Sequence, residues 1–179
     1  MARVPATGLR VEPLDKHHDR AAFSCGAGSL DAYLKTQASQ DMRRKANAVF
    51  VLVHPGDPRD ILGYYTLCAY ALPQGDVPEA ARRHIPRYPQ VGATLIGRLA
   101  VSRGHQGRGL GALLLADALR KADSNAAIIG SSMIVVDAID EAAVGFYSGF
   151  GFIRLPESLR LVLPIRAVAA LLGTTEKMR

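Results

Sequence analysis

The sequence predicts a mixed α/β fold (α+β) in which a central sheet of parallel and antiparallel strands is flanked by helices. Two observations lead to this class. Two apolar segments, Ala48–His54 and Ile61–Leu72, are separated by a Gly-Asp-Pro turn, which predicts an antiparallel hairpin. Closer to the C-terminus, strand-like and helical patterns alternate in the order β, α, β, α, β, which implies at least one right-handed parallel crossover.

The first helix is predicted from Ser29 onward, where apolar residues recur at steps of three and four and Ser29 is placed to cap the helix. The apolar positions are Leu30, Tyr33, Leu34, Ala38 and Met42. The basic residues Arg43, Arg44 and Lys45 follow, where positive charge suits the carboxyl end of a helix.

The remaining elements follow from apolar runs and from their interruptions. Pro73–Val91 contains four prolines and a basic run, so we expect an irregular or short-helical excursion there. After it we expect a strand over Thr94–Val101, a helix from Leu110, a buried strand over Met133–Val136, a helix over Glu141–Ser148 and a strand over Leu159–Leu163.

Length and composition indicate one folded domain spanning residues 1–179. Hydrophobic residues make up 49% of the chain and charged residues 21%, which excludes global disorder. No apolar run is long enough to span a bilayer, so no membrane association is expected. The two cysteines, Cys25 and Cys68, lie far apart and form no C-x-x-C motif; we expect reduced thiols and a cytoplasmic protein.

The charge balance favours phosphate-bearing partners. Lys and Arg number 22 against 16 Asp and Glu, which gives a net charge of +6. The basic residues fall into local groups: Arg43, Arg44 and Lys45; Arg82, Arg83, His84 and Arg87; Arg103, His105 and Arg108. Each group is also what an ordinary solvated surface contains.

A glycine-rich segment lies between the strand that ends at Val101 and the helix that begins at Leu110. It reads Gln106-Gly107-Arg108-Gly109-Leu110-Gly111. Glycines let the backbone approach a ligand closely, and the first N–H groups of a helix have no internal partner. Such a segment is suited to binding phosphate.

Several interpretations of this segment compete. A Walker loop is excluded because no Gly-Lys-Ser or Gly-Lys-Thr follows. A dinucleotide fingerprint is matched in relaxed form by Gly107-x-Gly109-x-x-Ala112, with Asp137 as the ribose-binding acid. Against it, several polar residues precede the first glycine, and only residues 112–179 remain for the rest of a doubly wound sheet. A glycine-rich connection without a ligand is the third possibility.

Two motifs give the chain a family resemblance. Gln106, Gly109 and Gly111 satisfy the pattern Gln/Arg-x-x-Gly-x-Gly/Ala, and residues 143–152 read Ala-x-x-Phe-Tyr-x-x-x-Gly-Phe. In this order, separated by one expected strand, the two motifs resemble the signatures of the GNAT acetyltransferases.

The resemblance implies acetyl-CoA as cofactor and a sheet in which the parallel strands ending near Val101 and Val136 splay apart. It implies these cofactor-binding residues: Leu99, Ala100, Val101, Gln106, Gly107, Arg108, Gly109, Leu110, Gly111, Asp140 and Phe146. A backbone N–H of the strand would polarise the thioester carbonyl. Asp140 departs from the Asn found in many members, which puts a neutral amide contact in doubt.

Tyr147 matches the family's general acid, which protonates the departing thiolate. An unperturbed tyrosine, with a pKa of about 10, is protonated at neutral pH. The alternative is an ordinary core aromatic residue beside Phe146. The resemblance suggests no metal ligands.

Further motifs resemble the GNAT toxins of bacterial toxin–antitoxin pairs. They are Phe23-x-Cys25-Gly26, Leu30-Asp31-x-Tyr33-Leu34, Gly63-Tyr64-Tyr65-Thr66-Leu67, Arg87-Tyr88-Pro89, Gly97-Arg98-Leu99-Ala100-Val101 and Val136-Asp137-Ala138. The resemblance implies acetylation of the α-amino group of aminoacyl-tRNA, which blocks translation. It also implies a ribbon-helix-helix antitoxin and a homodimer.

For tRNA contact we consider Arg98 and the basic residues Arg82, Arg83, Arg87, Arg43, Arg44 and Lys45. Arg98 is equally compatible with a buried structural arginine paired with an acid. An α-amino group has a pKa near 7.7–8.0, so no strong base is required. Two rival functions remain open: a GNAT enzyme for a free small-molecule or protein amine, and a CoA-binding or nucleic-acid-binding regulator without catalysis.

Overall fold

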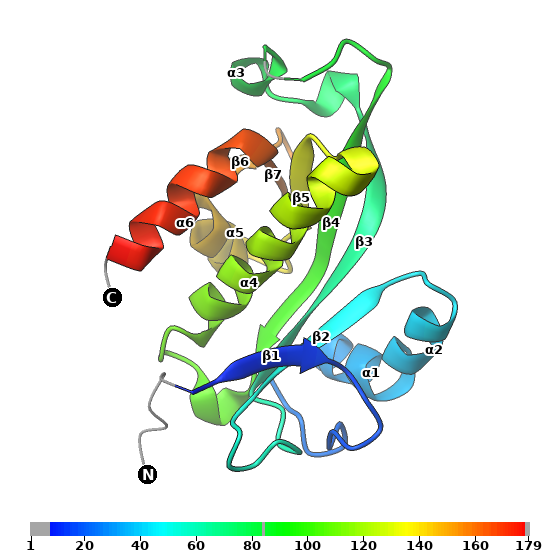
Figure 1. Ribbon diagram of the computed structural model, residues 1–179, viewed down its shortest axis with the longest axis vertical. Coiled ribbons are helices and arrows are strands. Elements are labelled where there is room, and N and C mark those ends of the chain that lie inside the picture. Colours follow the sequence, from blue (N-terminus) through cyan, green and yellow to red (C-terminus); the bar gives the residue numbers. More distant parts are fainter. Residues whose placement is uncertain (1–7, 84, 178–179) are drawn as a thin grey trace. The chain divides into compact units, whose positions relative to one another are not determined.

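The computed structural model describes residues 8–83 and 85–177 and contains one seven-stranded sheet, in the order β1-β2-β3-β4-β5-β7-β6 (Figure 1). The strands are β1 (Arg10–Pro13), β2 (Ala48–Val53), β3 (Gly63–Pro73), β4 (Gln90–Val101), β5 (Met133–Asp137), β6 (Ile153–Arg154) and β7 (Arg160–Pro164). β4 and β5 are parallel, whereas β1–β2, β5–β7 and β6–β7 are antiparallel. The predicted mixed sheet is therefore confirmed.

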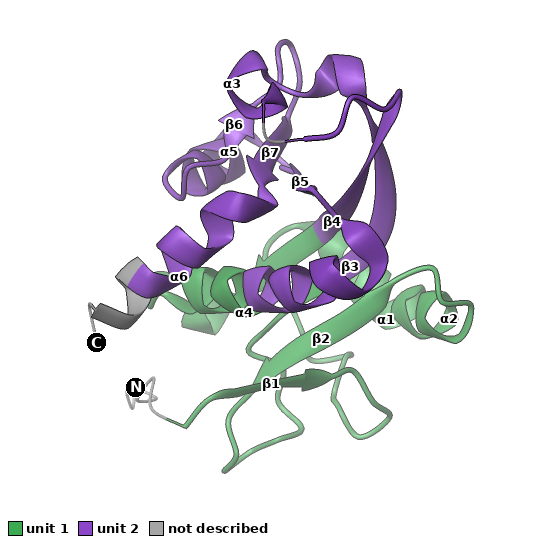
Figure 2. Cartoon of the chain, turned by 45° about the horizontal axis from the view of Figure 1, so that its top comes forward, with its two compact units in different colours: residues 1–66, 98–117 green, residues 67–97, 118–179 purple. Residues whose placement is uncertain are grey.

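Six α-helices are present among the described residues: α1 (Gly28–Thr36), α2 (Ala38–Arg43), α3 (Glu79–Arg82), α4 (Leu110–Asn125), α5 (Glu141–Ser148) and α6 (Val168–Lys177). A π-helical turn, Ala126–Gly130, follows α4. The chain divides into two compact units (Figure 2). Unit 1 contains the described residues up to Thr66 and Arg98–Asp117, and unit 2 contains Leu67–Gly97 and the described residues from Ala118 onward.

Aromatic side chains form the centre of the unit 1 core. The ring of Tyr64 lies edge-on to Phe23, with centroids 5.6 Å apart, and is stacked with Tyr33 at 6.4 Å. All three are buried, and an apolar side chain of this size contributes roughly 1.5–3 kcal/mol when it leaves water. The Tyr64 hydroxyl donates to the carbonyl oxygen of Leu30 at 2.7 Å, so burial leaves no polar atom of this side chain unsatisfied.

The predicted first helix is wrong in two respects. It is divided into α1 and α2 at Gln37, whose φ is −118°, and its N-cap is Ala27 instead of Ser29. The hydroxyl of Thr36 donates to the carbonyl oxygen of Ala32 at 2.7 Å, a local bond that competes with the helix backbone and bends helices. The apolar periodicity continues across this bend, so the sequence pattern did not show it.

The unit 2 core lies on one face of its strands. Met133 and Val135 of β5, Val162 of β7 and Ala93 of β4 alternate with residues on the other face, as the period of two in a strand requires. Val77, beside α3, packs into the same cluster. The segment that was expected to be irregular or short-helical therefore forms a 3₁₀ turn and α3, and it covers this face.

The other predicted elements agree with the structure to within a few residues at their ends. α5 has both predicted bounds, and the pairing of β4 with β5 confirms that the connection between them is a parallel crossover. β4 begins at Gln90, four residues before the predicted start. β1, β6, α6 and the π-helical turn were not predicted from the sequence. No described helix is long and apolar enough to cross a membrane.

Candidate functional site

The side chain of Gln106 fixes the loop between β4 and α4 within unit 1. Its amide nitrogen Nε2 donates to the carbonyl oxygen of Cys25 at 2.8 Å and to that of Val101 at 3.0 Å. The N–H of Arg103 donates to the carbonyl oxygen of Ser24 at 2.8 Å. The first residue of the predicted signature therefore ties the loop both to the end of β4 and to the segment that precedes α1.

The glycines of this loop border open space. Gly107 and Gly109 have φ of +75° and +79°, in the left-handed region, and a Cβ at either position would meet no atom within 4 Å. The first bond within α4 runs from the N–H of Leu113 to the carbonyl oxygen of Gly109 at 3.2 Å. The N–H groups of the three residues between them have no partner earlier in the helix, so the loop offers an open cradle for phosphate.

Basic side chains accompany the cradle. Arg103 and Arg108 are exposed, and their charges add attraction for an anion beside the amides. Within the described part of the chain, the ring nitrogen Nδ1 of His105 is buried and lacks a hydrogen-bond partner. The loop therefore combines backbone donors with positive charge, which a diphosphate needs.

The segment Phe23–Gly26 lies against the loop, in contact with Arg103 and Gln106. Gly26 has φ of +95°, and a Cβ there would lie 3.2 Å from Nε of Arg103. The N–H of Cys25 donates to Oδ1 of Asp31 at 2.9 Å, and burial together with this carboxylate raises the pKa of the Cys25 thiol. This contact was not predicted, although the glycine after Cys25 was visible in the sequence.

Leu99, Ala100 and Val101 of β4, which were predicted to contact the cofactor, lie where the backbone of β3 comes close to β4. β4 pairs with β5 only from Ala93 to Ile96 and continues to Val101. Ala100 is buried, and a Cβ on Gly63 of β3 would lie 2.8 Å both from its carbonyl oxygen and from Cδ1 of Leu114. Only glycine lets β3 and α4 approach β4 this closely in unit 1.

Tyr147, on α5 in unit 2, is 5% exposed and packs edge-on against Phe146 at 5.1 Å and Phe152 at 5.6 Å. Burial raises the pKa of Tyr147, so the phenol stays protonated at neutral pH. Its hydroxyl has no hydrogen-bond partner among the described residues, whereas the hydroxyls of the buried Tyr64 and Tyr65 both donate. The packing of Tyr147 between two phenylalanine rings is compatible with a core aromatic residue, and its protonated phenol is what a general acid requires.

Asp140 caps the helix that carries Tyr147. Its Oδ1 accepts a hydrogen bond from the N–H of Ala143 at 2.8 Å, the usual role of an aspartate at an N-cap. Phe146 is half-buried and packs against Phe150 at 5.2 Å. The structure thus gives both residues a part in the geometry of α5, in addition to the cofactor contact that the resemblance implied.

Among the described residues, Arg98 has no ion pair with an acid of the kind that the structural alternative expected. Its guanidinium carbon lies 3.5 Å from the centroid of the Tyr33 ring, a cation–π contact. The Tyr33 hydroxyl donates to Oδ2 of Asp41 at 2.9 Å. Hydrogen bonds from Gln37, Asn47 and Tyr33, with the nearby charge of Arg98, lower the pKa of Asp41. Arg98 therefore stabilises the α1–α2 segment through an aromatic ring.

The six other basic residues predicted to contact tRNA are all exposed. Arg43, Arg44 and Lys45 follow one another at the end of α2, in unit 1. Arg82, Arg83 and Arg87 lie in and after α3, in unit 2, and His84 of the same basic group lies outside the described residues. Exposure is what a phosphate contact requires, and ordinary surface charges share it.

The Asp137 carboxylate is paired with an arginine, whereas a ribose-binding acid would have its carboxylate available to the ligand. Its carboxylate is held by Arg160 through two hydrogen bonds, from Nε to Oδ1 at 2.7 Å and from Nη2 to Oδ2 at 2.9 Å. The same guanidinium donates to the hydroxyl of Tyr70. This group was not predicted, because its three members come from three different strands.

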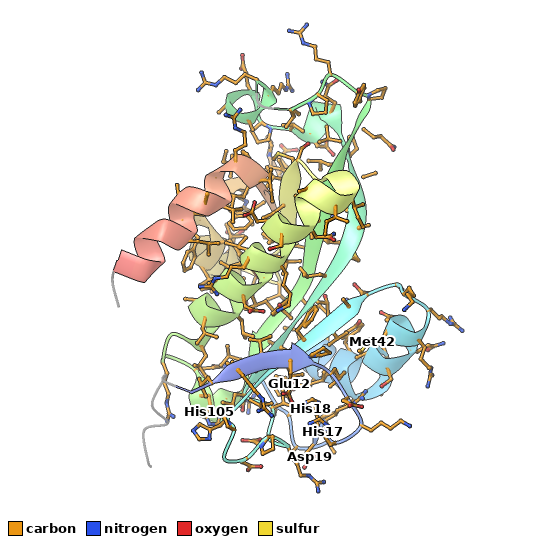
Figure 3. All side chains as sticks on the ribbon, viewed as in Figure 1. Glu12, His17, His18, Asp19, Met42 and His105 are labelled. Atoms are coloured by element: carbon orange, nitrogen blue, oxygen red, sulfur yellow. The ribbon has the colours of Figure 1, made fainter. Side chains whose placement is uncertain are left out.

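Glu12, His17 and His18 lie side by side near β1, as their labels in Figure 3 show. Glu12 Oε1 lies 2.7 Å from Nε2 of His18 and 3.4 Å from Nε2 of His17. The N–H of Asp15 donates to Nδ1 of His18 at 2.9 Å, so the ring proton belongs on Nε2, which donates to Glu12. These hydrogen bonds hold the segment after β1 against that strand.

Comparison with known proteins agrees with this geometry. Residues 35–152 match the model of the acetyltransferase (GNAT) family. A probable toxin TacT of Sinorhizobium fredii is 31% identical over 97% of this chain and 100% of its own. A tRNA-acetylating toxin of Mycobacterium tuberculosis is 36% identical over 87% of this chain and 91% of its own.

Solved structures show the same fold. AtaT complexed with acetyl-methionyl-tRNAfMet is 32% identical, with a TM-score of 0.83 over 91% of this chain and 98% of its own. A mutant of the AtaT toxin bound to the C-terminus of the antitoxin AtaR and acetyl-CoA is 28% identical, with a TM-score of 0.77 over 92% and 98%. With the family model covering most of the sequence and the Gln106–Gly111 loop in place, this chain belongs to the GNAT family of acetyltransferases.

Proposed function

We propose that the chain transfers the acetyl group of acetyl-CoA to the α-amino group of aminoacyl-tRNA and thereby blocks translation as a toxin. The observation that carries the proposal is the open amide cradle at Gly107 and Gly109, which fits a diphosphate. Support for the acceptor comes from a relative named a tRNA-acetylating toxin, and from a solved relative in complex with acetyl-methionyl-tRNAfMet.

In this proposal, the loop from Gln106 to Gly111 binds the diphosphate of acetyl-CoA, and Arg108 adds positive charge. A backbone N–H of Leu99–Val101 donates to the thioester carbonyl oxygen, where charge develops during transfer. Asp140 and Phe146 complete the contacts to the cofactor. When bound, acetyl-CoA supplies an activated acetyl thioester.

Tyr147 serves as the general acid. The neutral amine nitrogen bonds to the acetyl carbon as the bond from that carbon to sulfur breaks, and the tyrosine O–H donates its proton to the departing sulfur. Solvent takes the proton lost by the amine and restores the tyrosine. Because burial raises the pKa of Tyr147, the donor form is present throughout the neutral pH range.

Basic residues in both units are proposed to contact tRNA phosphates. They are Arg43, Arg44, Lys45, Arg82, Arg83, Arg87 and Arg98. Tyr88, which is 67% exposed next to Arg87, offers a ring on which an unpaired base can stack. Such binding weakens steeply as the salt concentration rises, because the release of counterions from the tRNA then contributes less free energy.

The broader setting is proposed from resemblance. Residues 1–179 form a single GNAT domain, the protein works in the cytoplasm where charged tRNA is found, and two copies form a homodimer. A ribbon-helix-helix antitoxin holds it inactive. Support for an antitoxin partner comes from the AtaT mutant solved with the C-terminus of AtaR.

The test incubates the purified chain with labelled acetyl-CoA and total charged tRNA, with deacylated tRNA as control. We expect label in aminoacyl-tRNA and none in deacylated tRNA, with a rate that falls as salt rises. Label in protein or in a free metabolite, and never in aminoacyl-tRNA, would instead establish the alternative of a small-molecule or protein acetyltransferase. Absence of any transfer would favour a non-catalytic regulator.

A further inference from the structure

A polar cavity of about 870 Å³ opens within unit 2, which is large enough for a small-molecule ligand. Its wall is formed by the turn before α3 and α3 itself, by the end of β5, and by the segment from β6 to the start of β7. None of the residues in its wall has a role in the proposed acetyl-CoA contacts.

The most ordered charged group in the wall is the Asp137–Arg160 pair. Asp137 and Arg160 are opposite each other in the antiparallel β5–β7 pairing, which sets their side chains at bidentate distance, 2.7 and 2.9 Å. Arg160 is also held by Tyr70: its guanidinium donates to the phenol oxygen and its carbon lies 4.7 Å from the ring centroid. The carboxylate and the phenol oxygen raise the pKa of Arg160, which is therefore a permanent cation.

The pair is asymmetric toward solvent. The side chain of Asp137 is 43% exposed, whereas that of Arg160 is 23% exposed. Each carboxylate oxygen accepts one hydrogen bond from Arg160 and keeps a second lone pair. Asp137 thus presents fixed, unused acceptors to the cavity, and Arg160, which also lines the cavity, is the less exposed member of the pair.

The charges around the cavity favour a cationic guest over an anionic one. Arg154 is already neutralised by Glu141 through two bonds of 2.8 and 2.9 Å, and Nε of Arg82 donates to the carbonyl oxygen of Val77. Asp76 and Glu79 also line the cavity, and neither has an ion-pair partner among the described residues. Arg82 has a neutral carbonyl as its partner and keeps its charge, so the unpaired groups in the wall are the two carboxylates Asp76 and Glu79 against one guanidinium, an excess of one negative charge.

We propose that Asp137 binds the α-amino group of the aminoacyl-tRNA substrate, and that this cavity receives the aminoacyl end of the tRNA. The inference rests on the proposed function, which supplies an amine as acceptor. Asp137 is the last residue of β5, and three residues later comes the N-cap of α5, the helix that carries Tyr147. Because both carboxylate oxygens are engaged by Arg160, Asp137 orients the amine, and solvent takes the proton that the amine loses.

The test compares the binding of aminoacyl-tRNA with that of the same tRNA carrying the matching 2-hydroxy acid, in which a hydroxyl replaces the amine. The wild-type chain binds the amine form more tightly, by about 10- to 100-fold, the value of a hydrogen bond to a charged group. Asp137→Asn keeps an acceptor for Arg160 but removes the charge, and it abolishes this preference. The ratio of the two affinities does not depend on how much of a preparation is folded.

Glu141→Gln is the matched control, because it breaks the bidentate pair of Arg154 in the same wall without touching Asp137. It retains the preference for the amine. If Asp137→Asn keeps the wild-type ratio, or weakens both ligands equally, the proposal is overturned. If the wild type prefers the amine but transfers no acetyl group to it, the proposed function fails while the Asp137 site stands.

Discussion

Replacing Gly109 by alanine separates the cost of backbone strain from the loss of cofactor binding. Gly109 has φ of +79°, where an L-residue costs about 1–2 kcal/mol, and the added Cβ meets no protein atom within 4 Å. The loss of stability is therefore limited to that strain, which lowers the Tm of a chain of this size by about 2–8 °C. The new methyl group occupies the space beside the helix amides and displaces a hydrogen bond to a charged phosphate, so acetyl-CoA binds about 10- to 100-fold more weakly.

Calorimetric titration gives the acetyl-CoA affinity and a thermal melt gives the Tm. Gly130→Ala provides the matched control, because Gly130 has φ of +82° and equally open surroundings but lies after α4, far along the chain from the loop. It lowers the Tm by the same amount and leaves acetyl-CoA binding unchanged. Equal affinities for the two variants would refute the assignment of the loop as the diphosphate cradle.

Three further outcomes are expected. Gly63→Ala places a Cβ 2.8 Å from the Ala100 carbonyl oxygen and from Leu114, so it lowers the free energy of unfolding by about 1–3 kcal/mol; an unchanged urea midpoint would contradict the close approach. Desolvation opposes ionisation of Glu12, but hydrogen bonds from His18 and Arg10 prevail and lower its pKa. This stabilisation is present above the unfolded pKa of about 4.3 and is lost as pH falls through the lower folded value. In Glu12→Gln the free energy of unfolding therefore depends less on pH between these two pKa values, which denaturation at several pH values can check. The double variant Arg83→Gln with Arg87→Gln reduces the slope of log K against log salt concentration for tRNA binding, by about 0.7–0.9 for each phosphate that is no longer neutralised. The control variant Arg120→Gln, at an exposed residue of α4, leaves the slope unchanged if the proposed tRNA contacts are correct.

The elements with strong periodicity were predictable from sequence. α5 was predicted with both of its bounds, and the start of α4 was predicted at Leu110 because Leu110, Leu113, Leu114 and Ala118 recur at helical spacing. β1 and β6 are short, with four and two residues, and carry too few positions for an alternation to be visible. At the bend between α1 and α2 the Thr36 hydroxyl donates to the Ala32 carbonyl oxygen, a local bond that leaves the apolar pattern intact.

The candidate site was predictable where its chemistry is local in sequence. The spacing of the glycines after Gln106 indicated the cradle, because the donors are consecutive backbone groups. The contact of Gln106 with Cys25 joins residues 81 apart, and that of Arg160 with Tyr70 joins residues 90 apart. Partners this far apart in the sequence cannot be identified before the arrangement of the strands is known. The contact of Gln106 with Cys25 and the Asp137–Arg160 pair were therefore found only in the structure.

The position of the acetyl group in the product tests the proposed reaction most directly. After reaction of the chain with acetyl-CoA and charged tRNA, the amino acid is released from the tRNA and analysed by mass spectrometry. We expect acetylation of the α-nitrogen by the wild type and a rate lower by about 10²–10⁴-fold for Tyr147→Phe, with acetyl-CoA affinity unchanged. An acetyl group found on any other atom, or an equal rate for Tyr147→Phe, would contradict the proposed chemistry.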